Sequence, residues 1–100
     1  MIDKISEALN QFCEQNGRGP RDLEIVPGQF GGYYVTLVWD GFRSMGLAER
    51  ISVLAEFLTK VLGPVMSQVR SLDAVTFNER TEQEAVEAAI PSDPPWLRAN

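Results

Sequence analysis

The chain of 100 residues contains no histidine and only one cysteine, Cys13. Without histidine it has no imidazole metal ligand, no Ser-His-Asp triad and no side chain whose ordinary pKa lies near 7. A single cysteine excludes an internal disulfide and a cysteine cage around zinc or an iron–sulfur cluster. These shortages remove many reaction mechanisms, so we expect a protein that is not an enzyme and that holds no metal or cofactor.

Basic residues are also scarce, since 9 Lys and Arg against 14 Asp and Glu give a formal net charge of −5. They are scattered along the chain, whereas binding to a phosphate backbone needs them clustered, so we expect no nucleic-acid partner. No run approaches the roughly 18 consecutive apolar residues of a membrane span. Residues 1–5 lack the basic and apolar regions of a signal peptide. We therefore expect a cytoplasmic protein without a membrane partner.

Apolar residues make up 44% of the chain, and their periodic spacing predicts a single domain over residues 1–90. Helical spacing covers residues 2–13, strands are predicted at 22–26 and 33–39, and a second helix runs from Leu47 to the Gly63–Pro64 stop. A short helix through Val69, a strand at 73–77 and a helix at about 82–89 follow. The last helix is predicted from a capping box, Thr81-x-x-Glu84. Residues 91–100 are Pro-rich and are expected to form a flexible tail.

This order, α-β-β-α-α-β-α, predicts an α+β fold with a mixed three-stranded sheet and helices packed mainly on one face. The glycine-bearing connection between the first two strands indicates an antiparallel hairpin. The long connection from the strand at 33–39 to the strand at 73–77 favours parallel pairing through a right-handed crossover. Leu54 and Leu58 lie on the apolar face of the second helix and are expected at the centre of its packing on the sheet.

Three groups of side chains have both a chemical and a structural interpretation. Cys13 is either a redox thiol or a packed residue, and its place on an apolar helix face favours burial. Asp40, Glu49 and Arg50 form either a carboxylate–cation site or, the alternative we favour, solvated charges at a helix start. The third group is a cluster of acidic residues, Glu79, Glu82, Glu84 and Glu87. These residues either bind a divalent ion or form a solvated face at the start of a helix, and we favour the solvated face.

A partner-binding surface is expected on the strand at 33–39, because so few helices cannot cover both faces of the sheet. Aromatic residues such as those of this strand are enriched in binding hot spots. We expect the less apolar face to be the open one, and it carries Tyr34, Thr36 and Val38. In the tail, Trp96 is a further candidate contact, with a partner or with its own domain.

Three stretches of the chain resemble the BolA family of small domains, and the resemblance covers about residues 1–88. Residues 38–42, Val-Trp-Asp-Gly-Phe, are similar to a strand of that family followed by a Phe. Residues 46–50, Gly-Leu-Ala-Glu-Arg, look like the Ser-Leu-Val-x-Arg that opens its central helix. Residues 75–84, Val-Thr-Phe-Asn-Glu-Arg-Thr-Glu-Gln-Glu, resemble its last strand and the start of a Thr-Pro-Glu-Glu-type helix.

The resemblance implies that the protein is a regulator or a partner of monothiol glutaredoxins. Members of the family share a [2Fe–2S] cluster with these glutaredoxins through a histidine. The matching residue here is Ile51, which cannot ligate iron, and residues 29–32, in the loop that usually carries the other ligand, offer no soft ligand. We therefore expect a non-enzymatic interaction or regulatory domain without a cluster, which binds a protein partner or forms a weak homodimer. The alternative is a small-molecule-binding or enzymatic domain that uses Asp, Glu, Arg or Tyr side chains.

The charge balance predicts that the protein does not bind nucleic acid. Electrostatic attraction to phosphates is strongest at low salt, so the most sensitive test is a polarisation titration with labelled DNA and RNA at low ionic strength. We expect no saturable binding. Micromolar affinity under these conditions would contradict the prediction.

Overall fold

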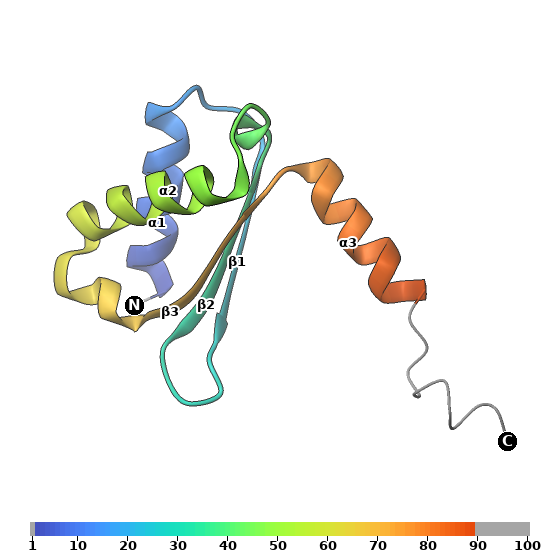
Figure 1. Ribbon diagram of the computed structural model, residues 1–100. Helices are drawn as coiled ribbons and strands as arrows, with labels where there is room; N and C mark the ends of the chain where they lie inside the picture. Colours follow the sequence, from blue (N-terminus) through green and yellow to red (C-terminus); the bar gives the residue numbers. More distant parts are fainter. Residues whose placement is uncertain (1, 90–100) are drawn as a thin grey trace, which may run out of the picture.

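The computed structural model describes the backbone of residues 2–89 (Figure 1). The elements follow one another in the order α1 (Ile2–Gln15), β1 (Arg21–Pro27), β2 (Tyr33–Trp39), η1 (Asp40–Phe42), α2 (Leu47–Leu62), η2 (Gly63–Gln68), β3 (Val69–Val75) and α3 (Phe77–Ala89). The two η elements are short 3₁₀ helices. The predicted α+β fold and its element order are confirmed, whereas the predicted tail at 91–100 lies outside the described residues.

The sheet has the order β1-β2-β3, so β2 is its central strand. β1 pairs antiparallel with β2, as the glycine-bearing connection predicted, and β2 pairs parallel with β3, as the long connection predicted. Helices α1 and α2 cover one face of the sheet, while α3 leaves the end of β3 on the other side (Figure 1). Within residues 2–89, the outer face is therefore covered only where α3 begins.

The core lies between the sheet and the two helices α1 and α2. Phe12 of α1 meets the rings of Trp39 and Phe42, with ring centroids 5.8 Å and 6.3 Å away. The indole N–H of Trp39 donates a hydrogen bond of 2.8 Å to the Arg18 carbonyl, so burying this ring leaves its polar atom satisfied. Leu54 of α2 is also fully buried, as its helical spacing predicted.

Two predicted boundaries in the second half of the chain are wrong. The short helix after Gly63 ends at Gln68, and Val69 already pairs with Tyr33, so β3 covers Val69–Val75 and not residues 73–77. The last helix begins at Phe77, five residues before its predicted start at 82. The cause is a capping box earlier than the predicted one, which is described with the site below.

Replacing Leu54 with alanine should lower the free energy of unfolding by about 2–5 kcal/mol, because it opens a cavity at a fully buried site. Val61→Ala on the same helix is the matched control, since Val61 is 44% exposed. Denaturant titrations of both variants and the wild type measure the difference. Equal losses for the two variants would contradict this assignment of the core face of α2.

Candidate functional site

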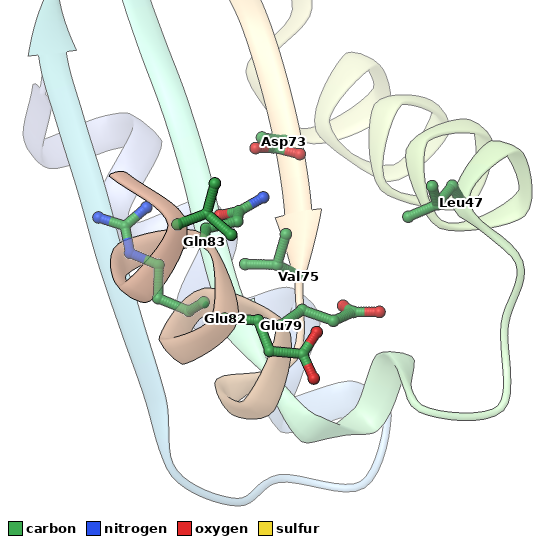
Figure 2. Close-up of a pocket in the computed structure, with 8 residues that line it drawn as sticks. Leu47, Asp73, Val75, Glu79, Glu82 and Gln83 are labelled. Carbon is green, nitrogen blue, oxygen red and sulfur yellow. The ribbon is translucent and has the colours of Figure 1, made fainter. Parts of the chain in front are cut away.

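An open groove runs between the start of α2, the end of β3 and α3 (Figure 2). Its volume is about 620 Å³. Leu47 forms one wall, Asp73 and Val75 lie on the floor, and α3 forms the opposite wall with residues that include Glu82 and Val86. Leu47 is 66% exposed and Val86 is 59% exposed, so both walls present apolar side chains to the open groove.

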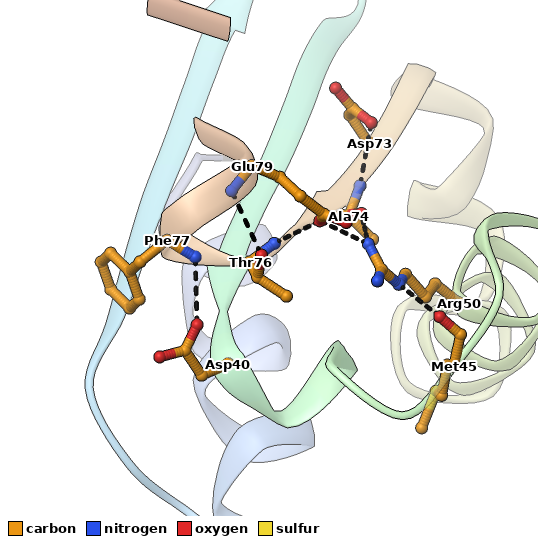
Figure 3. A network of polar contacts seen from close by, with 8 residues as sticks. All are labelled: Asp40, Met45, Arg50, Asp73, Ala74, Thr76, Phe77 and Glu79. Atoms are coloured by element: carbon orange, nitrogen blue, oxygen red, sulfur yellow. Dashed lines mark hydrogen bonds and ion pairs between the residues drawn. The ribbon is translucent and has the colours of Figure 1, made fainter. Parts of the chain in front are cut away.

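Beneath this groove Arg50 of α2 is buried, with only 5% of its surface exposed (Figure 3). Its Nη1 atom lies 2.6 Å from Oε1 of Glu79 and 3.4 Å from the carbonyl oxygen of Ala74. Its Nε–H donates to the Met45 carbonyl at 3.0 Å, and its guanidinium lies over the ring of Phe42. One cation therefore joins α2 to the last residues of β3 and the first turn of α3.

The start of α3 is fixed by a reciprocal capping box. The Glu79 N–H donates to the Thr76 hydroxyl at 3.3 Å, and the Thr76 N–H donates to the Glu79 carboxylate at 2.8 Å. This is the Thr-x-x-Glu motif in which two otherwise unsatisfied backbone donors find partners. The Asp40 carboxylate also accepts the Phe77 N–H at 3.1 Å. The direction in which α3 leaves the sheet is thus set within its first turn.

A second ion pair ties α3 across the outer face of the sheet. Arg80 pairs with Glu24 of β1 and, at 3.3 Å, with Glu84 one turn further along α3. Both basic side chains beside the groove, Arg50 and Arg80, are therefore already bound to carboxylates. The Arg50–Glu79 pair joins α2 to α3, and the Arg80–Glu24 pair joins α3 to β1.

Electrostatics at Glu79 favour its charged form. The hydrogen bond from the Arg50 guanidinium, followed by the hydrogen bond from the Thr76 N–H, lowers the pKa of the Glu79 carboxyl below its ordinary value. At neutral pH the buried guanidinium of Arg50 therefore faces an ionised carboxylate, which is the arrangement that offsets the cost of burying a cation.

The residues proposed from sequence as a partner surface are only partly open. Tyr34 is 42% exposed and Thr36 is half-buried on the outer face of the sheet. Val38 is only 2% exposed, so the expectation that it lies open is wrong. It neighbours Val75 at the end of the sheet where α3 begins, and both are buried there. Trp96 lies outside the described residues.

The predicted surface and the groove are continuous. Thr36 pairs with Asp73 and Val38 pairs with Val75 in the parallel register of β2 and β3, and Asp73 and Val75 form the groove floor. The predicted surface on the strand at 33–39 therefore lies next to the groove floor. The walls were missed because Leu47 and α3 come from parts of the chain that no spacing connects to this strand.

The prediction of solvated charges is wrong for Arg50, whereas Glu79 stays partly exposed although it is ion-paired. Arg50 is buried and Glu79 is its partner, while Asp40 and Glu49 are exposed as expected. Glu82 and Glu84 are exposed on α3. A sequence signal for Glu79 existed, because Thr76-x-x-Glu79 has the same capping pattern as the predicted Thr81-x-x-Glu84.

The other residues that were candidates for a chemical role are Cys13, Ile51 and the acidic side chains. Cys13 is buried, as predicted, and burial raises the pKa of its thiol to about 11, so it stays protonated at neutral pH. Ile51 is half-buried and packs against the core. Among the side chains that the structure describes, those of residues 2–86, no three His, Cys, Asp or Glu are grouped so as to hold a metal ion. None of the described helices combines the length and apolar character needed to cross a bilayer.

Comparisons with known proteins give no relative from which to transfer a role. No protein-family model, curated protein or solved structure matches the chain.

Changing Glu79 to Gln should reduce stability in a pH-dependent manner. The pKa of Glu79 is lowered in the folded state, so its contribution is present above the ordinary carboxyl pKa and is lost as the pH falls through the folded value. At pH 7 we expect a loss of about 1–2 kcal/mol, because the carboxylate is partly exposed and screened. The difference from wild type should shrink towards pH 3.

Denaturant titrations at pH 7 and pH 3 measure this effect, with Glu82→Gln on an exposed part of α3 as the control. The control should differ little from wild type at either pH. A Glu79→Gln loss that stays constant between the two pH values would show that the ion pair does not carry it.

Proposed function

We propose that the protein is a non-enzymatic interaction domain of the BolA-like type, and that its partner binds in the groove between α2, β3 and α3. The observation that carries the proposal is the pair of exposed apolar side chains, Leu47 and Val86, on opposite walls of one groove. Exposed apolar side chains that line one groove, with a few polar groups beside them, are typical of binding sites. The neighbouring outer face, with Tyr34 and Thr36, extends the surface that a partner would contact.

The internal contacts of Glu79 and Arg80, two of the four charged side chains that line the groove, favour binding over catalysis. Glu79 is engaged by Arg50 and Thr76, and Arg80 by two carboxylates. A general base or a nucleophile must reach a substrate atom with an available lone pair or proton. Groups that are committed to internal contacts suit a rigid docking surface.

The BolA-like part of the proposal is supported by the motifs and by the order of elements. The central helix opens with the Gly-Leu-Ala-Glu-Arg stretch, and the last strand leads directly into a helix. We propose further that this chain does not share an iron–sulfur cluster. Ile51 stands at the position of the family's ligand, and its hydrocarbon side chain has no donor atom for iron and packs against the core.

The same groove favours a second candidate function, binding of a small molecule. Its volume of about 620 Å³ falls within the roughly 300–1,000 Å³ of known ligand pockets. A thermal-shift screen against metabolites separates the candidates, because a ligand that binds only the native state raises the melting temperature. A hit that Leu47→Glu abolishes would favour the small-molecule function.

Charged substitutions at the apolar walls of the groove should weaken partner binding. We expect Leu47→Glu and Val86→Glu each to lower partner recovery at least tenfold in quantitative affinity purification, because each places a charge in an apolar contact. Val61→Glu on the far part of α2 is the matched control, since Val61 is similarly exposed. Light scattering on the same proteins tests whether the partner is a second copy.

The proposal fails if every recovered protein, and any dimer, is retained equally by the two groove variants and by the Val61→Glu control.

A further inference from the structure

The groove has an excess of negative charge. Asp73 on its floor and Glu82 on its wall are exposed, and neither forms an ion pair within residues 2–89. The nearby cations cannot neutralise them, because Arg50 is held by Glu79 and Arg80 by Glu24 and Glu84. A partner that brings its own positive charges would therefore gain electrostatic attraction beside the apolar contact.

The backbone of β3 at the groove floor is already engaged. The Ala74 N–H donates to the Asp73 carboxylate at 3.1 Å, and the Ala74 carbonyl accepts from Arg50 at 3.4 Å. A strand added to this edge would need those two groups as its own hydrogen-bond partners. A partner at this point must therefore be bound through side-chain contacts. This requirement favours a helix that lies in the groove over a strand added to the edge of the sheet.

We infer that the groove accepts an amphipathic basic helix, with Leu-sized side chains between Leu47 and Val86 and Lys or Arg beside Asp73 and Glu82. This inference rests on the proposed docking function and specifies the chemistry of the partner. In an amphipathic helix, apolar residues three or four positions apart form one stripe, and basic residues can flank it on either side. The side chains of Leu47 and Val86 would contact such a stripe, and Asp73 and Glu82 would attract basic residues beside it.

The probe for the test is a fluorescein-labelled helical peptide of Leu and Lys, about four turns long, and its counterpart with Glu in place of every Lys. Polarisation titrations use the full chain. We expect saturable binding of the Lys peptide that weakens at high salt, because screening reduces attraction between exposed charges. The Glu peptide should bind at least tenfold more weakly or not at all.

Two sets of variants assign the binding to the groove. Asp73→Asn with Glu82→Gln should weaken binding about threefold to tenfold, consistent with the small worth of exposed ion pairs. Asn still offers the oxygen that accepts the Ala74 N–H. The matched control, Asp3→Asn with Glu7→Gln on exposed positions of α1, removes the same charge far from the groove and should change binding less than twofold. Leu47→Ala and Val86→Ala should each weaken it about tenfold, and Val61→Ala should not.

The outcomes separate this inference from the docking function on which it rests. If the apolar groove variants weaken binding but the charge variants, salt and the Glu peptide change nothing, the groove is a docking site and the basic chemistry is wrong. If the groove variants behave like their controls, neither the inference nor the docking function stands.

Discussion

The buried guanidinium of Arg50 is the constraint on which the arrangement of α2, β3 and α3 depends. A buried cation is tolerated only when its donors are satisfied, and here Met45, Ala74 and Glu79 supply the acceptors. These three partners come from the loop before α2, from β3 and from α3. The same contact that satisfies the cation therefore fixes how α3 leaves the sheet and how wide the groove opens.

Elements whose information is local were predictable from the sequence. The strand Tyr33–Trp39 and the helix Leu47–Leu62 have the predicted bounds, because a run of β-branched and aromatic residues and a clear helical spacing each end at a glycine or proline stop. The boundary between β3 and α3 was not predictable from the sequence, because two Thr-x-x-Glu patterns lie five residues apart and either could begin the helix. Tertiary contacts select the first of them, namely Glu79 with Arg50 and the Phe77 N–H with Asp40.

The candidate site was predictable only in part, for a related reason. The strand carrying Tyr34 and Thr36 indicated the side of the sheet that remains open, and its register places Asp73 beside Thr36. The groove itself is formed by Leu47 and Val86, which are 39 residues apart in sequence and share no periodicity. Val38 was misplaced because its burial depends on where α3 crosses the end of the sheet.

Because α3 is attached to the domain only through its first turn in the described residues, a small tilt there produces a larger displacement further along the helix. Among the described residues, the polar contacts that join this helix to the rest of the chain lie within residues 77–80. Val86 stands seven residues beyond Glu79, about 10 Å along the axis at the rise of an α-helix. A tilt of about 10° at the anchored turn would therefore move Val86 by roughly 2 Å on that geometry. Small changes at the Arg50–Glu79 contact would thus be amplified at the outer rim of the groove, while the floor on β3 stays in place.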